Sequence, residues 1–186
     1  MAKADACFDD IDADEVVAGL FVGSLDAALD ETWIRAVHIS TVVNVSGSSY
    51  NPLPGICYLH VPMRDDNDAP LLPAFTAAWP VVFDALTRKK RVLVHCKLGR
   101  SRSAAIAMMV LMRWLSSSLR EAYDAVRAAR PLVRVPLLGF QLQLTQFERR
   151  EFGCKSNTIE DWAGAVAADA EGARQLRSKK RRTAEV

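Results

Sequence analysis

One short segment constrains this chain more than any other, because an apolar run there leads through a polar loop into a long apolar stretch. Val92–Val94 come just before Cys96, a loop with Gly99 and Arg102 follows, and residues 104–115 are almost entirely apolar. The first run is typical of a buried strand and the long stretch of a buried helix. We therefore expect a strand, an anion-binding loop and a helix, an arrangement found in α/β domains.

The cysteine in this loop is placed to act as a nucleophile on phosphorus. The thiolate is the reactive form, but a free thiol has a pKa of about 8.5 and is mostly protonated at neutral pH. Inward-facing backbone N–H groups and the positive end of the following helix lower that pKa, and they also stabilise a phosphate dianion. Arg102 adds a planar guanidinium that can bind two phosphate oxygens at once.

Neighbouring residues have predicted supporting roles. Gly99 lets the backbone approach an anion closely because it has no Cβ. We expect the Ser103 hydroxyl to hydrogen-bond the Cys96 sulfur and so make the thiolate a better leaving group. His95 is expected to orient the loop from behind rather than to act as a base. A cysteine after a strand is often only a small buried hydrophobic residue, but the surrounding His, Gly and Ser residues favour a catalytic one.

The motif resembles that of a known enzyme family. His95-Cys96-x5-Arg102-Ser103 resembles the signature of the cysteine-based protein tyrosine phosphatases, and Ser101-Arg102-Ser103 resembles its dual-specificity branch. Further similar segments come in the family's order, at residues 19–24, 39–45, 61–65, 130–131 and 139–142. The resemblance implies an α/β fold with a single, mainly parallel central sheet flanked by helices. It places the catalytic domain at residues 11–152, between an N-terminal extension (1–10) and an alanine-rich, basic C-terminal extension (153–186).

The resemblance also implies roles for individual residues. The loop residues expected to bind the phosphate are Lys97, Leu98, Gly99, Arg100, Ser101 and Arg102. Asp65 aligns with the family's general acid, which protonates the leaving oxygen and then activates water against the phosphocysteine. Asp66 and Asp68 are close enough in sequence to compete for this role. All three could instead be solvated residues of a surface loop.

Two positions depart from the family pattern. The turn before the last helix is Pro136-Leu137-Leu138-Gly139-Phe140, where an Asn that supports the phosphate loop is usual at the position of Leu137. We expect either that another polar group replaces it or that the loop is less rigid. Leu98 stands where a smaller Ala is common and is expected to crowd the loop slightly.

The substrate class is less constrained. No aromatic and basic segment resembles the loop that deepens the pocket of phosphotyrosine-specific members, and there is no room for a kinase-docking domain. We therefore expect a small atypical protein phosphatase that acts on phosphotyrosine, phosphoserine and phosphothreonine. Lys97 and Arg100 instead resemble members that act on phosphoinositides or phosphatidylglycerophosphate, so a lipid phosphatase is the alternative. A phosphate-binding module without turnover is disfavoured because Cys96 and Arg102 are both present.

Composition narrows the other possibilities. A length of 186 residues predicts one core, and a net charge of +2 gives no indication of nucleic-acid binding. The four cysteines lie far apart, which favours neither a zinc site nor a disulfide framework. We expect no metal or cofactor, no membrane span, and a cytoplasmic location, with nuclear import through the basic residues 179–182 as the alternative. Oligomeric state is not predicted.

The remaining pattern alternates between strands and helices. Edge-strand pieces are expected at 16–22 and strands at 41–45 and 56–63, with Cys57 in the core and His38 and His60 structural. Helices are expected at 25–37 with Ser24 as N-cap, at 73–86 with a kink at Pro80, and at 119–129, 139–152 and 158–176.

Overall fold

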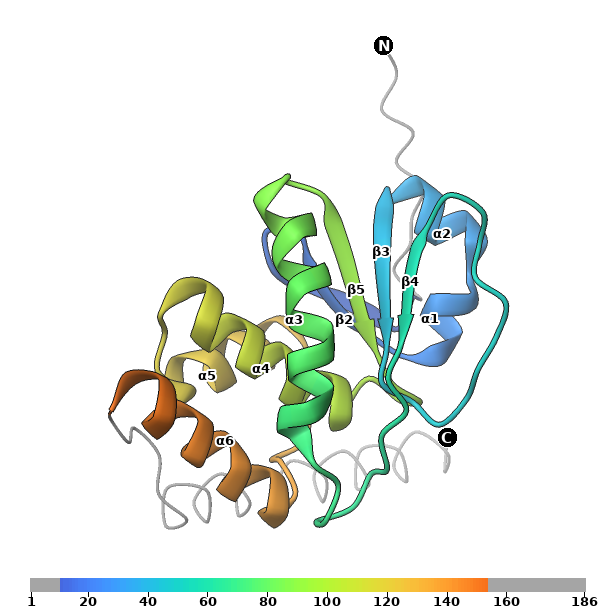
Figure 1. The fold of residues 1–186 in the computed structure, drawn as a ribbon. Coiled ribbons are helices and arrows are strands. Elements are labelled where there is room, and N and C mark those ends of the chain that lie inside the picture. Colours follow the sequence, from blue (N-terminus) through green and yellow to red (C-terminus); the bar gives the residue numbers. More distant parts are fainter. Residues whose placement is uncertain (1–10, 154–186) are drawn as a thin grey trace, which may run out of the picture.

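The computed structural model describes residues 11–153, and a five-stranded sheet forms its centre (Figure 1). The strands are β1 (Ala13–Val17), β2 (Leu20–Gly23), β3 (Ile39–Asn44), β4 (Cys57–His60) and β5 (Arg91–His95), in the order β1-β2-β5-β3-β4. All neighbouring pairs are parallel except β1 and β2. The predicted α/β fold with a mainly parallel central sheet is therefore confirmed, and β5 lies in its middle.

Helices cover both faces of the sheet. The short helices α1 (Leu25–Leu29) and α2 (Glu31–Ala36) pack on one face, and α3 (Leu71–Thr87), α4 (Arg102–Leu115), α5 (Leu119–Ala129) and α6 (Leu138–Phe152) form a larger layer on the other. Successive residues of a strand point to opposite faces. Val92 and Val94 accordingly pack into the larger core, whereas Leu93 packs into the smaller one with Trp33 and Ile34.

Helix α4 is the centre of the larger core. Its residues from Arg102 to Met112 are all buried, as its nearly uniform apolar sequence predicts. The helix begins two residues before the predicted start, so the arginine of the loop lies in its first turn. None of the helices in residues 11–153 is long and apolar enough to cross a membrane.

Several local predictions are corrected by the structure. The helix expected at 25–37 is two helices, because Asp30 ends α1 and its side chain then accepts the Trp33 N–H at 2.9 Å as the N-cap of α2. The predicted N-cap at Ser24 is confirmed by a 3.3 Å bond from the Ala27 N–H. Strand β2 is not at the edge, since it lies between β1 and β5.

Two further predictions depend on the edge strand and on a proline. The prediction of a buried Cys57 is wrong: its side chain is exposed, because it begins the short edge strand β4. Helix α3 extends from Leu71 to Thr87, two residues before and one after the predicted bounds, with Pro80 inside it. The alanine-rich segment 158–176 and the basic residues 179–182 lie outside the described residues.

Candidate active site

The predicted nucleophile lies where the central strand ends and the central helix begins. Cys96 directly follows β5 and is only 2% exposed. Ser103, in the first turn of α4, donates its hydroxyl hydrogen to the Cys96 sulfur over 3.4 Å. The chain between them turns at Gly99, where φ is +63° and a Cβ would lie 2.6 Å from the backbone of Gly23. Only glycine fits there without strain.

The surroundings of Cys96 favour its thiolate. Burial alone raises the pKa of the thiol, because the charged form loses its hydration. The Ser103 hydroxyl and N–H, the charge of Arg102 and the Leu98 N–H act in the opposite direction, and together they lower the pKa below its ordinary value. A lowered pKa is the property that a nucleophilic cysteine needs at neutral pH.

The guanidinium of Arg102 is fixed beside the sulfur but is not fully paired. One terminal nitrogen, Nη1, donates to the backbone oxygen of Met63 over 3.0 Å. The Nε of Arg102 is buried and has no hydrogen-bond partner among the described residues. Because an unpaired buried donor is costly, this nitrogen is suited to bind an oxygen of an incoming anion.

The three acidic residues of the loop after β4 are separated by the fold. Asp65 reaches the phosphate loop, because its Oδ1 accepts the Ser101 hydroxyl hydrogen at 2.7 Å and its Oδ2 lies 3.7 Å from Arg102 Nε. Asp66 instead pairs with Arg64 at 3.0 Å and accepts the N–H of Asp68. Asp65 is therefore the carboxylate placed to exchange a proton with a group bound in the loop.

His95, the last residue of β5, is held by two hydrogen bonds. Its Nδ1 is 3.2 Å from the carbonyl oxygen of Cys96 and its Nε2 is 2.8 Å from the Tyr50 hydroxyl. A carbonyl can only accept, so Nδ1 carries the hydrogen and Nε2 accepts from Tyr50. Burial lowers the pKa of His95 to about 4, so the ring is neutral at neutral pH.

With this geometry in place, comparison with known proteins identifies the family. The family model of the dual specificity phosphatase catalytic domain matches residues 20–150. The chain belongs to this family.

Named relatives agree with this assignment. The chain is 37% identical over 134 residues to human dual specificity phosphatase 28, covering 72% of this chain and 76% of the relative. It is 33% identical over 146 residues to bovine dual specificity protein phosphatase 18, covering 78% and 76%. The crystal structure of human dual specificity phosphatase 28 superposes with a TM-score of 0.71 at 35% identity, covering 75% of this chain and 95% of that structure.

This dual-specificity phosphatase supports its phosphate loop with a residue that sequence reasoning missed. Arg130, at the end of α5, is 1% exposed and donates from Nε to the Gly99 carbonyl over 2.7 Å, while its Nη2 lies 3.4 Å from the Leu98 carbonyl. Asp12 and Asp14 bind its two terminal nitrogens. Leu137 makes no side-chain cap at α6, whereas Arg130 is a polar group that does support the phosphate loop.

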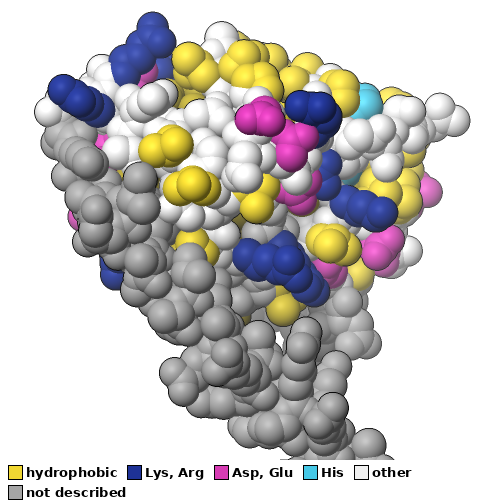
Figure 2. Space-filling model, turned by 90° about the horizontal axis from the view of Figure 1, so that it is seen from below, with side chains coloured by type: hydrophobic (Ala, Val, Ile, Leu, Met, Phe, Trp, Pro, Cys, Tyr) yellow, Lys and Arg dark blue, Asp and Glu magenta, His cyan; other side chains and the backbone are white. Residues whose placement is uncertain are grey.

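Two loop side chains differ in how they meet solvent. Leu98 is 54% exposed, so the expectation that it crowds the loop is wrong. Lys97 is exposed as well, whereas Arg100 is partly buried and its carbonyl accepts the Arg134 N–H at 3.1 Å. Seen from below Figure 1, acidic, basic and apolar side chains lie interspersed on the described part of the surface (Figure 2). The groups that lower the Cys96 pKa are accordingly near neighbours, namely Ser103, Arg102 and the Leu98 N–H.

Proposed function

We propose that this member of the dual-specificity family hydrolyses phosphate monoesters of phosphotyrosine, phosphoserine and phosphothreonine in proteins through a phosphocysteine intermediate. One observation carries the proposal. A thiol with a lowered pKa lies against Ser103, and the buried Nε of Arg102, which has no hydrogen-bond partner among the described residues, lies 3.7 Å from the carboxylate of Asp65. Nucleophile, anion-binding group and proton donor thus converge on one point.

The reaction follows in two steps from this arrangement. The Cys96 thiolate attacks phosphorus, the bond to the leaving oxygen breaks, and Asp65 gives that oxygen a proton. Water then attacks the phosphocysteine while Asp65 takes a proton from it, and the P–S bond breaks. Ser103 stabilises the released thiolate through its hydrogen bond. Arg102 binds the phosphoryl oxygens in both steps, where charge develops.

Protein substrates are favoured over lipids. Relatives that are 33% identical to the chain over the aligned residues are named dual specificity protein phosphatases. An enzyme that works on an anionic membrane is helped by a cluster of basic residues facing it, but the described part of the face in Figure 2 mixes acidic with basic side chains. The lipid alternative is consequently the weaker of the two.

Steady-state kinetics of the full chain test the proposal. Cys96→Ser is expected to abolish turnover of phosphotyrosine and phosphothreonine peptides, yet to retain binding of phosphate analogues, because the cradle is unchanged. Turnover by this variant at the parent rate would rule out Cys96 as the nucleophile. Parallel assays with short-chain phosphoinositides discriminate the alternative, since a higher kcat/KM on lipid than on peptide would reverse the preference.

For location, we also propose the cytoplasm, because a free catalytic thiol is preserved in a reducing compartment. The basic residues 179–182 give nuclear import as the alternative. Imaging of a fluorescent fusion, with and without Ala substitutions at these four positions, distinguishes the two.

A further inference from the structure

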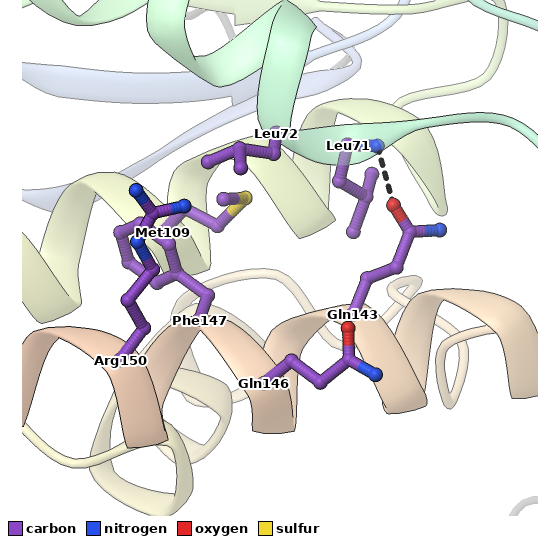
Figure 3. Close-up of a pocket in the computed structure, with 7 residues that line it drawn as sticks. All are labelled: Leu71, Leu72, Met109, Gln143, Gln146, Phe147 and Arg150. Carbon is purple, nitrogen blue, oxygen red and sulfur yellow. Dashed lines mark hydrogen bonds between the residues drawn. The ribbon is translucent and has the colours of Figure 1, made fainter. Parts of the chain in front are cut away.

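A pocket of ≈ 150 Å³ lies away from the thiol, between the start of α3 and helix α6. Figure 3 shows its lining residues, with Gln143 of α6 pointing towards the backbone of Leu71. The pocket is lined by Leu71, Leu72, Met109, Gln143, Gln146, Phe147 and Arg150. Leu71 begins α3 and directly follows the segment that carries Asp65. The polar part of the lining therefore touches the end of the acid-bearing segment.

The side-chain amide of Gln143 binds the backbone of two residues at the end of this segment. Its Oε1 accepts the Leu71 N–H at 2.7 Å, and its Nε2 donates to the Ala69 carbonyl over 3.0 Å. The same Nε2 also lies 3.2 Å from the Gly139 carbonyl in its own helix. Both ends of the amide are thus used, and the carboxyl-terminal end of the acid segment is tied to α6.

The middle of the segment is held against the first turn of the same helix. Asn67 Oδ1 accepts the Gly139 N–H at 3.1 Å. A Cβ on Gly139 would lie 1.8 Å from the Asn67 backbone oxygen, so the two backbones are in direct contact. A glycine is needed at position 139 for this close approach rather than for its backbone angles.

We propose that Gln143, assisted by Asn67, is a positioning residue for Asp65, which rests on the proposed role of Asp65 as the proton donor. Asp65 is exposed, and its side chain contacts Ser101 and Arg102 of the phosphate loop. It lies in an irregular segment between β4 and α3, where only contacts with other elements can fix the backbone. Gln143 fixes that segment four residues after Asp65, and so helps to set where the carboxyl group lies beside Ser101 and Arg102 of the phosphate loop.

Leaving-group dependence measures this role directly. An acidic phenol such as para-nitrophenol leaves with little help from an acid, whereas phenol itself needs a proton. In the full chain, Gln143→Met is expected to lower kcat/KM on phenyl phosphate about tenfold and kcat/KM on para-nitrophenyl phosphate much less, a part of the loss that removing a general acid causes. The readout is kcat/KM because it reports the first step, in which the leaving group departs, whereas hydrolysis of the phosphocysteine is the same for both substrates. Gln146→Met is the matched control, because Gln146 lines the same pocket from the same helix but its side chain has no hydrogen bond within the described residues. It should behave like the parent.

Several outcomes decide the matter. Equal losses on both substrates, or the same loss in Gln146→Met, would overturn the role of Gln143. Asp65→Ala separates the proton-donor role of Asp65 from the positioning role of Gln143. If Asp65→Ala steepens the dependence of the rate on the leaving group and Gln143→Met does not, only the positioning role fails. If Asp65→Ala does not steepen it, the proton donor is another group and the positioning role fails with it. The double variant Asp65→Ala/Gln143→Met should show no steeper dependence of the rate on the leaving group than Asp65→Ala alone. A steeper dependence in the double variant would contradict the proposal.

Vanadate inhibition serves as the control for correct folding of the variants. Vanadate inhibition should match the parent in Gln143→Met, because the phosphate loop does not touch this helix position. Asn67→Ala provides a second variant. Because Asn67 is exposed and Gln143 is partly buried, we expect this substitution to destabilise the fold less than Gln143→Met. It should shift the leaving-group dependence in the same direction as Gln143→Met, and a parental dependence in both variants would refute the proposal.

Discussion

Replacing Arg130 tests whether the phosphate loop is held in shape from outside. The Arg130 guanidinium binds the outward-facing carbonyls of Leu98 and Gly99. The N–H that shares a peptide plane with each of these carbonyls points the opposite way, into the cradle. Arg130→Met removes this support and should therefore weaken the binding of a tetrahedral anion as well as the stability of the fold.

The two effects can be estimated from the contacts. Loss of one partner from a buried ion pair costs about 3–5 kcal/mol, but Asp12 and Asp14 are 34% and 40% exposed and can regain water. We therefore expect a loss of roughly 2–3 kcal/mol, or a fall in Tm of roughly 4–10 °C for a domain of this size. Misalignment of the inward N–H groups should weaken vanadate inhibition about tenfold, which corresponds to about 1.4 kcal/mol.

Thermal unfolding and vanadate inhibition of the full chain give the two readouts. Arg130→Lys should keep part of the stability, since an ammonium still pairs with a carboxylate, but not the anion affinity, because one ammonium cannot span both carbonyls and both carboxylates. Adding Asp12→Asn and Asp14→Asn to Arg130→Met should restore Tm without restoring vanadate affinity. An Arg130→Met protein with parental Tm and parental vanadate inhibition would refute the reasoning.

Four other substitutions address single interactions in the site. Ser103→Ala removes the strongest of the contacts that lower the Cys96 pKa, so the pKa of the thiol rises. Because a charge-assisted hydrogen bond of about 1.5 kcal/mol is lost, alkylation of Cys96 by iodoacetamide should slow by up to about tenfold at pH values below the thiol pKa. At high pH, where the thiol is ionised in both proteins, the two alkylation rates should converge. Asp65→Ala should lower kcat on phosphotyrosine peptides about 10²-fold and abolish the limb of the pH–rate profile on which activity falls as the acid loses its proton. Asp66→Ala should leave both kcat and the pH–rate profile unchanged. The reverse result would reassign the acid. His95 has a pKa of about 4 when folded against 6.5 ordinarily, so between these values the unfolded chain binds a proton that the folded chain does not, and stability falls by about 3 kcal/mol as the pH is lowered. His95→Asn should flatten this dependence in urea unfolding, and an unchanged slope would show that His95 is not its source.

The parts of the site that could be predicted are those encoded by neighbouring residues. The run before Cys96 and the apolar stretch after Ser103 specify a buried strand and a buried helix, and the loop between them must then lie at the carboxyl edge of the sheet. The order β1-β2-β5-β3-β4 places that loop near the middle. The strand–loop–helix that carries the nucleophile thus follows from local pattern alone.

The parts that could not be predicted depend on contacts between distant residues. Arg130 is 118 and 116 residues from the carboxylates that bind it, and no local pattern links them. A weak signal exists, because Asp12 and Asp14 are two positions apart in an extended segment and so point to the same side. That spacing indicates a shared partner but does not say which cation it is.

The proton donor raised a different difficulty, because Asp65, Asp66 and Asp68 have the same chemistry and nearly the same place in sequence. Only the path of the backbone decides which of them reaches Ser101 and Arg102, and contacts with α6 help to set that path. The cradle, in contrast, is held by Arg130 at the end of α5. Since separate helices position the two halves of the site, a change in one half need not disturb the other. Loss of proton transfer with full anion binding, and loss of anion binding with proton transfer intact, should therefore be obtainable as distinct variants of this one chain.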